Sequence, residues 1–199
     1  MVKNRIRLHF QTQDPILFSV LDPIEPVVPR HPSTYFVSLC RAIIGQQLST
    51  TVADVIFSRF ETLFKGKPIE PDVILAVSDE ALRKIGMSGA KVKFIKDAAA
   101  KVQSGEVVFS ALSTMNEAEV IETLTKIKGV GPWTAEMFCM FTLGREDVFS
   151  FGDLGLKRAI QELYSLKKEP SVRTMTRLSN RWKPYRTYAA LALWNFKDR

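Results

Sequence analysis

The stretch KIKGVGPWTAEMF, residues 126 to 138, places two glycines and a proline directly before a predicted helix. Gly129 and Gly131 allow positive φ angles and let another group approach the backbone without meeting a Cβ. Pro132 suits the first position of a helix, where a main-chain N–H would have no intrahelical partner. Two interpretations stay open here. The stretch is either a plain turn between two helices or a turn whose free N–H groups bind an anion at the positive end of the second helix.

The sequence on both sides of this turn predicts helices. Asn116, followed three residues later by Glu119, is typical of a capping box and predicts a helix to about residue 127. Beyond the turn, apolar residues at helical spacing predict helices over residues 132–143, 153–164, 172–180 and 184–196. Upstream, four more helices are predicted to begin near Ser33, Ser49, Ser78 and Gly89. The second of these should bury one face formed by Val52, Val55, Ile56, Phe60 and Leu63.

The first 32 residues are predicted to be irregular. Five prolines, at positions 15, 23, 26, 29 and 32, argue against a long helix there. The stretch RIRLHF, residues 5 to 10, alternates between polar and apolar residues and is the best candidate for a strand. Strand patterns are otherwise scarce, so the predicted fold class is all-α.

The charge of the chain favours a polyanionic partner. Its 199 residues include 28 Lys and Arg against 21 Asp and Glu, which gives a net charge of +7. An excess of this size is typical of proteins that bind nucleic acid. A soluble protein that is merely basic would show the same total, so charge alone does not decide between the two.

Two cysteines are too few for a four-cysteine metal site. Cys40 and Cys139 both lie in apolar helical patterns and are expected to be reduced core residues. We therefore expect no transition metal and no required cofactor. No run of 18 apolar residues suggests a membrane span, and the N-terminus is too polar for a secretion signal. The expected location is the cytoplasm, in association with the nucleoid, or the nucleus if the source is eukaryotic.

The residues of the glycine turn form a longer and more specific pattern. The full run resembles the helix-hairpin-helix of DNA repair proteins: Leu124-x-x-Ile127-x-Gly129-Val130-Gly131-x-x-Thr134-Ala135. The resemblance implies that the main chain at Gly129, Val130 and Gly131, aided by Lys128 and Thr134, holds a DNA backbone phosphate. It also implies a possible Na⁺ or K⁺ held by the carbonyl oxygens of Thr125, Ile127 and Val130.

An aspartate follows the hairpin in the stretch DVFSFGDLGLKRAI, residues 147 to 160. Asp153 opens a predicted helix and has an ordinary explanation as its N-cap. The order of hairpin, turn and aspartate nevertheless resembles the HhH-GPD base-excision DNA glycosylases. Two further stretches, RAIIGQQLSTTVA (41–53) and RWKPYRTYAALALW (181–194), resemble the alkylation-repair branch of that family, 3-methyladenine DNA glycosylase II (AlkA-type). The similarity in order and motif covers roughly residues 33–196.

This resemblance implies an architecture and a set of partners. The chain would be a single catalytic unit, residues 1–199, with two helical lobes and an active-site cleft between them. Residues 35–145 would form the lobe that carries the hairpin, and residues 1–34 with 146–199 the second lobe. The partner would be double-stranded DNA with alkylated bases, bound by a monomer.

The resemblance also implies roles for single residues. The carboxylate of Asp153 would stabilise the oxocarbenium-like charge on the sugar or activate a water molecule, and the residues leave these two open. Trp133 and Trp194 would line the base pocket with Met137, which stands where the family has a tyrosine. Gln47 would fill the gap left by the extruded base. The expected phosphate contacts are Lys128, Arg158, Lys183 and Arg186.

Each of these residues also has a plainer structural explanation. Trp194 can be a core residue, Gln46 and Gln47 can satisfy buried backbone groups, and a surface cation can simply be solvated. Relatives that also cut the DNA strand carry a lysine two positions after the second hairpin glycine, where this chain has Trp133. The implied activity is therefore a monofunctional glycosylase for alkylated purines, without lyase activity. The alternatives are a non-catalytic DNA-binding or damage-sensing protein and a sister glycosylase for another damaged base.

Overall fold

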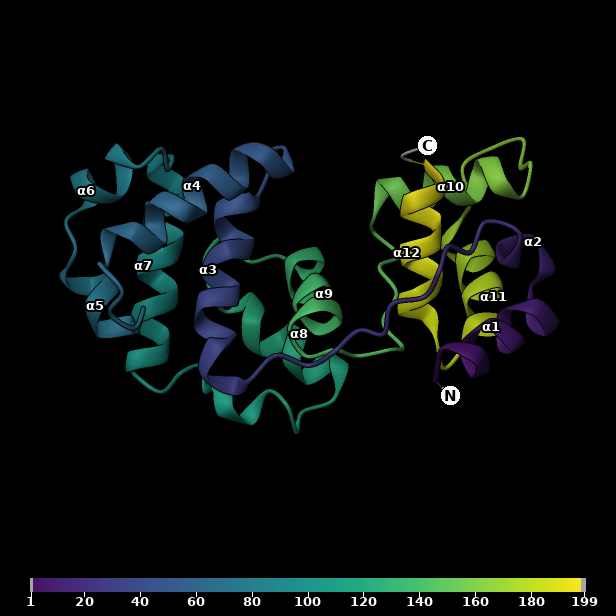
Figure 1. Cartoon of the computed structure of the whole chain (residues 1–199), viewed down its shortest axis with the longest axis horizontal. Helices are drawn as coiled ribbons and strands as arrows, with labels where there is room; N and C mark the ends of the chain where they lie inside the picture. The colour runs from purple at the N-terminus through teal and green to yellow at the C-terminus, as the bar shows by residue number, and fades with distance from the viewer. Residues whose placement is uncertain (1, 198–199) are drawn as a thin grey trace. The chain divides into compact units, whose positions relative to one another are not determined.

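A computed structural model describes residues 2–197, and every regular element in that range is a helix (Figure 1). The all-α prediction is confirmed. The chain divides into two compact units. One, here called the hairpin unit, is the continuous segment Arg30–Leu143. The other, the terminal unit, combines Pro29 and the residues before it with Gly144 and the residues after it.

The hairpin unit contains seven α-helices and two short 3₁₀ helices. Side chains cap four of the α-helices at their N-termini, and each accepts the main-chain N–H of the third residue of its helix: Ser49, Ser78, Ser88 and Asn116. The capping box predicted for Asn116 and Glu119 is present with both of its hydrogen bonds. The elements are η1 (Pro32–Thr34), α3 (Tyr35–Gly45), α4 (Thr50–Leu63), α5 (Pro71–Ala76), α6 (Asp79–Lys84), α7 (Gly89–Gln103), η2 (Phe109–Ala111), α8 (Glu117–Thr125) and α9 (Pro132–Phe141).

Helix α3 lies at the centre of this unit and packs against α4, α7 and α9 (Figure 1). Its residues Leu39, Cys40, Ile43 and Ile44 are fully buried. Burial raises the pKa of the Cys40 thiol, because the apolar surroundings disfavour the thiolate. Cys40 and Cys139 are both buried and neither forms a disulfide, as the sequence predicts.

Two details of this unit differ from the sequence prediction. Ser33 does not cap α3; the chain turns one residue earlier, because Pro32 occupies the first position of η1 and His31 accepts the Ser33 N–H. In α4 the buried residues are Ile56, Phe57 and Phe60. This stripe leaves Val52 and Val55 at its edge, and both are nearly half exposed.

The terminal unit contains five α-helices. Their bounds are α1 (Val2–Gln13), α2 (Pro15–Phe18), α10 (Leu154–Leu163), α11 (Val172–Trp182) and α12 (Arg186–Lys197). Helix α1 contradicts the prediction of an irregular start and of a strand over residues 5–10. Ile6 and Phe10 are fully buried while Leu8 is 63% exposed, so the buried pair follows the four-residue spacing of a helix. The prolines restrict the chain only from Pro15, which begins α2.

A buried carboxylate joins the N-terminal helices to the C-terminal ones. Asp14 has no exposed surface, and its oxygens accept hydrogen bonds from the Leu17 N–H, the Tyr164 hydroxyl at 2.7 Å and the Trp182 indole N–H at 2.9 Å. The guanidinium of Arg181 lies 3.7 Å away. Because a buried charge costs free energy unless it is paired, this network is a strong constraint on the packing of α2 and α11. It also accounts for Trp182 as a structural residue.

Candidate functional site

The glycine turn joins α8 to α9 and rests on the core of the hairpin unit. Ile127 and Val130 are buried, 1% and 4% exposed. Gly129 has a φ of +77°, and a Cβ on it would lie 2.2 Å from the ring of Phe94 on α7. Glycine is therefore required at this position both by the backbone angle and by the aromatic ring packed against it.

The main-chain N–H groups of the glycine turn differ in whether they have a hydrogen-bond acceptor among the described residues. The Lys128 N–H donates to Asp97 Oδ2 at 2.8 Å, and the Val130 N–H donates to the Ile127 carbonyl at 3.1 Å. Within the described residues, the N–H groups of Gly129 and Gly131 have no such partner. Gly131 is the N-cap residue of α9 and Gly129 lies two residues before it. Main-chain N–H groups without a partner at such a place can bind an anion. The Val130 N–H, in contrast, is already engaged.

The carbonyl groups named for a monovalent cation come from the same turn. Thr125 is the last residue of α8, where carbonyl groups lack helical partners and the helix dipole is negative. The Ile127 oxygen accepts one hydrogen bond, from Val130, and a carbonyl oxygen has two lone pairs. Neutral oxygen ligands at a helix C-terminus suit a hard cation in their chemistry.

The side chains of Gln46 and Gln47, which follow α3 directly, behave differently. Gln46 donates from Nε2 to the Gly129 carbonyl at 2.8 Å and to Thr134 Oγ1 at 3.3 Å. Gln47 is exposed, its φ is +57°, and its side chain has no hydrogen-bond partner among the described residues. Gln46 therefore bonds a backbone group, although that group belongs to the exposed Gly129, and Gln47 bonds none among the described residues. The Thr134 hydroxyl is buried against Gln46, so this residue can offer a phosphate only its main-chain N–H.

Two of the predicted pocket residues share one face of α9. Trp133 and Met137 are four residues apart, the spacing that brings side chains together on a helix. Trp133 is 48% exposed and Met137 is half-buried. A half-exposed indole beside a polarizable thioether is suited to contact with a flat, electron-poor ring.

The predicted catalytic aspartate caps α10 in the terminal unit and also contacts the predicted pocket tryptophan. Asp153 is 8% exposed, and its Oδ1 accepts the Leu156 N–H at 2.8 Å. The indole N–H of Trp194, on α12, donates to the same oxygen at 3.3 Å. A Cβ added to Gly155 would lie 3.0 Å from that oxygen, so the space beside the carboxylate is tight. Helix capping explains the first donor but not the second.

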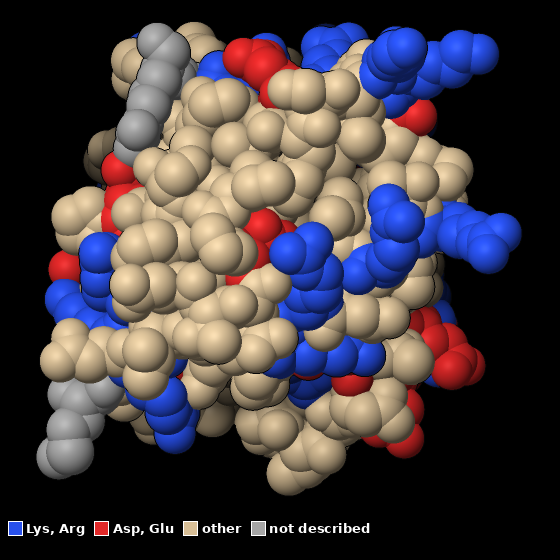
Figure 2. Space-filling view, turned by 90° about the vertical axis from the view of Figure 1, so that its right-hand side faces the viewer, with Lys and Arg blue, Asp and Glu red and all other residues tan. Residues whose placement is uncertain are grey.

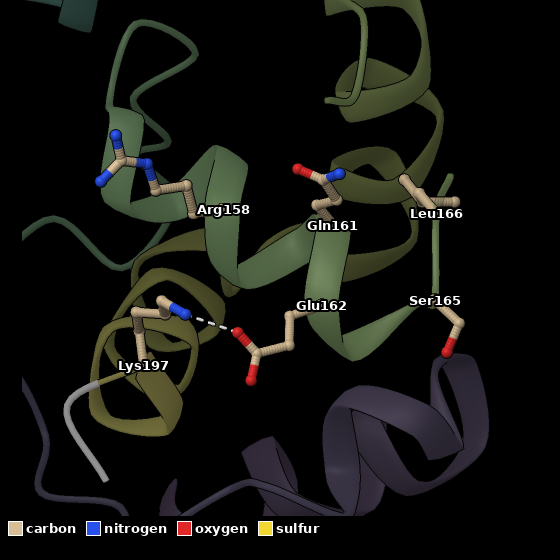
Figure 3. A pocket seen from close by; sticks show the side chains of 6 residues that line it. All are labelled: Arg158, Gln161, Glu162, Ser165, Leu166 and Lys197. Carbon is tan, nitrogen blue, oxygen red and sulfur yellow. Dashed lines mark hydrogen bonds and ion pairs between the residues drawn. The ribbon is translucent and has the colours of Figure 1, made fainter. Parts of the chain in front are cut away.

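The predicted phosphate contacts differ in how they are engaged. Arg158 lines an open cavity of about 430 Å³ on α10, and its guanidinium points away from the Glu162–Lys197 pair (Figure 3). Within the described residues, neither Arg158 nor Lys183 has a charged or hydrogen-bonded partner. Lys128 lies 3.6 Å from Asp97 with its side chain 75% exposed. Arg186 is different, because its guanidinium is held by Asp147 at 2.7 Å and its side chain is only 16% exposed.

Basic side chains do not gather in one continuous patch on the face drawn in Figure 2, where acidic groups lie between them.

Three residues of α7 that support this region were not found from the sequence. Phe94 contacts Gly129, Asp97 accepts the Lys128 N–H, and Lys91 Nζ donates to the Ile44 carbonyl at 2.7 Å. Partial burial lowers the pKa of Lys91, because the charged ammonium is less well solvated there. Their three-residue spacing places them along one side of α7, but the sequence predicts only the helix itself and not which residues that side contacts.

These features define a helix-hairpin-helix protein with a carboxylate held by two N–H donors at the start of a later helix. The family description "HhH-GPD superfamily base excision DNA repair protein" matches residues 40–184. The chain belongs to this family.

Several similar proteins share both sequence and fold with the chain. DNA-3-methyladenine glycosylase 1 of Schizosaccharomyces pombe is 35% identical over 158 residues, covering 78% of this chain and 69% of that protein. A crystal structure of a DNA-3-methyladenine glycosidase from Bacillus halodurans has a TM-score of 0.82 and 36% identity, covering 99% of this chain and 89% of the other. The S. pombe glycosylase Mag1 in complex with abasic DNA has a TM-score of 0.81 and 30% identity, with 96% and 95% covered.

The matched lengths differ among relatives. The chain spans 56% of the length of a Bacillus subtilis relative to which it is 32% identical over 162 residues. Among the described residues, no helix is both long and apolar enough to cross a membrane.

Proposed function

We propose that the protein is a monofunctional DNA glycosylase that hydrolyses the N-glycosidic bond of alkylated purines in duplex DNA, as a step of base excision repair. The similar proteins are named as 3-methyladenine glycosylases, and one of them was solved with abasic DNA. The observation that carries the proposal is the Asp153 carboxylate, which receives an indole N–H that helix capping does not require.

The Asp153 carboxylate would stabilise the transition state of the hydrolysis. As the bond between the base and the sugar lengthens, positive charge develops on the sugar, and a fixed negative charge nearby stabilises that transition state. The two donors on Oδ1 fix the orientation of the carboxyl group before the substrate arrives. A purine alkylated at a ring nitrogen is cationic and a good leaving group, so it needs little proton donation. Asp153 can also orient or deprotonate the attacking water.

The hairpin unit would supply the grip on DNA. The Gly129 and Gly131 N–H groups suit a backbone phosphate, with Lys128 close by and a Na⁺ or K⁺ held by the carbonyl oxygens of Thr125, Ile127 and Val130. Such an ion would add positive charge beside the phosphate. Gln47, exposed and without internal partners, would enter the duplex in place of the extruded base. Trp133 and Met137 would contact the cationic base, and each aromatic contact contributes about 0.5–2 kcal/mol.

The absence of strand cutting follows from the residue after Pro132. A lyase needs an amine there to form a Schiff base with the sugar, and Trp133 offers none. We expect reaction products to remain uncut until alkali is added, and borohydride to trap no covalent complex with DNA.

The main test replaces one atom of the carboxylate. Asp153→Asn keeps an N-cap of equal quality, so the fold and the affinity for DNA should be retained. Base release, measured as free base from duplexes that carry one methylated adenine, should fall by about 10²–10³-fold or more, because the negative charge is lost. Release at the parent rate would show that Asp153 is not catalytic and would favour a non-catalytic DNA-binding protein.

The lesion must be tested separately. Duplexes that carry 3-methyladenine, 7-methylguanine, 8-oxoguanine or uracil at one position should be compared under identical conditions. We expect the two cationic purines to be released fastest. Preference for 8-oxoguanine or uracil would assign the chain to a sister activity in the same family.

A further inference from the structure

We propose that Gln46 is a positioning residue. Its hydrogen bond to the hairpin fixes the position of Gln47 relative to the main-chain N–H groups that would bind a DNA phosphate. This inference rests on the proposed function and adds a residue for which that function has no role. It comes from the conformation of one turn and from one hydrogen bond that links two segments far apart in the sequence.

The turn after α3 has the geometry of a type II β-turn. The Leu48 N–H donates to the Gly45 carbonyl at 3.2 Å. Gln46 has φ −54° and ψ 129°, and Gln47 has φ +57°. In a type II turn the third residue needs a positive φ, and glycine is the usual choice there. Gln47 occupies that position with a full side chain.

A side chain in this conformation costs free energy and persists only when the surroundings hold it there. Nothing within Gln47 compensates for it, since its side chain is exposed and has no partner among the described residues. The restraint must therefore come from contacts that Ile44 and Gln46, on the N-terminal side of Gln47, make with other helices and turns.

Two contacts supply that restraint from outside the turn. Lys91 of α7 donates to the Ile44 carbonyl at 2.7 Å, which fixes the end of α3. Gln46 donates from Nε2 to the Gly129 carbonyl at 2.8 Å. Because a carbonyl can only accept, this bond fixes which way the Gln46 amide faces. The same nitrogen lies 3.3 Å from the buried Thr134 hydroxyl oxygen, which closes the link on α9.

The far end of this link is itself rigid. Gly129 is pinned by the Phe94 ring and its neighbour Lys128 by Asp97, both from α7. The N–H that would hold a phosphate and the carbonyl that accepts from Gln46 therefore belong to the same residue, Gly129. The distance between a phosphate bound at the hairpin and the Gln47 side chain would then be fixed, although Gln47 lies 82 positions before Gly129 in the chain.

The test is a double-mutant cycle between Gln46 and Gln47. Gln46→Met keeps the length of the side chain and removes the donor, and Gln47→Ala removes the inserted side chain. The readout is the ratio of affinities for a duplex with a tetrahydrofuran abasic analogue and for the undamaged duplex, alongside the rate of base release. A purely structural role for Gln46 would lower the melting temperature and leave that ratio unchanged.

We expect Gln46→Met to keep its affinity for undamaged DNA and to lose about tenfold in the affinity ratio, within the range of coupling between residues in contact. Adding Gln47→Ala to Gln46→Met should then cost little more. Gln46→Lys, which restores a donor for the Gly129 carbonyl, should recover most of the loss and guards against a folding defect in the first variant.

Independent, additive losses at the two positions, or an unchanged ratio in Gln46→Met, would overturn the inference. Failure of the proposed function would look different, because the parent protein itself would then release no base and show no preference for the abasic duplex.

Discussion

The two donors on Asp153 set the geometry of a single oxygen. Leu156 reaches it through the backbone of the same helix, whereas Trp194 reaches it from α12, 41 residues later. Asp153 can be recognised in the sequence because it stands at the start of the predicted helix, in the N-cap position. Its pairing with Trp194 is not, because no local pattern shows which side of α12 faces α10. The sequence suggests Trp194 as a wall of the base pocket, and the structure adds a hydrogen bond to the carboxylate.

Replacing Trp194 by phenylalanine tests that hydrogen bond. Trp194→Phe keeps an aromatic ring but removes the N–H, so Asp153 Oδ1 loses the donor that comes from α12. We expect base release to slow by about tenfold, given the usual strength of a hydrogen bond to a charged group. Single-turnover rates at saturating enzyme measure this step without the contribution of binding.

Trp182 offers a matched control for the same exchange. Its indole N–H donates to the buried Asp14, and the side chain has no exposed surface. Trp182→Phe should therefore lower the melting temperature and leave single-turnover release close to the parent value. If the two variants behaved alike, Trp194 would be a packing residue with no part in positioning Asp153.

At the scale of elements, the two glycines of the hairpin have different reasons to be glycine. Gly129 has a positive φ and a ring against it, so its own fold requires it. Gly131 has φ −91° and ψ 174°, which any residue can adopt, and a Cβ there would meet nothing within 4 Å. The structure leaves that space open to a partner, which is what close approach of a DNA strand would need.

Replacement by alanine should have different effects on stability and on DNA binding at the two glycines. Gly129→Ala should destabilise the protein by about 2–4 kcal/mol, from the positive φ and the contact with Phe94. Gly131→Ala should leave the free energy of unfolding within about 1 kcal/mol of the parent. It should still weaken DNA binding, by about tenfold if the methyl group costs 1.4 kcal/mol against a phosphate. Denaturant titration and DNA binding measured on both variants decide this, and unchanged binding by Gly131→Ala would refute the close approach.

Most helices were predictable because their caps and apolar spacing are local. The errors lie where one pattern fits two structures. In residues 5–10, Ile6, Leu8 and Phe10 alternate as a strand would, but Ile6 and Phe10 also stand four apart, and burial of that pair decides for a helix. In α4, Val52 and Val55 are as apolar as the buried residues and are exposed only because the neighbouring helices lie on another side. Partners such as Asp97 and Phe94 depend on packing between helices, which spacing within one helix does not reveal.

For the whole molecule, the net charge of +7 and the unengaged cations predict salt-sensitive binding to DNA. If about three to five phosphates are neutralised, the logarithm of the association constant should fall with a slope of roughly −3 to −5 against the logarithm of salt concentration. Lys183→Ala should reduce the steepness by about one. Fluorescence anisotropy of a labelled duplex at several salt concentrations measures both, and a flat response would speak against nucleic acid as the partner.

Arg186 provides the comparison for that experiment. Its guanidinium is already held by Asp147, so removing it should change the slope less than removing Lys183 does. A larger effect at Arg186 would mean that the ion pair opens when DNA binds.

The terminal unit is made from both ends of the chain, and this governs the order in which the protein can fold as it emerges from a ribosome. The hairpin unit is one continuous segment, and its ends are tied by the Arg30 N–H bonded to the Thr142 carbonyl at 2.8 Å. It can therefore close while translation continues. Helix α1 is made first but must wait, at usual elongation speeds, for roughly ten seconds or more until α10–α12 follow. During that delay Ile6 and Phe10 have no core to enter, so α1 is the segment that a chaperone would need to protect.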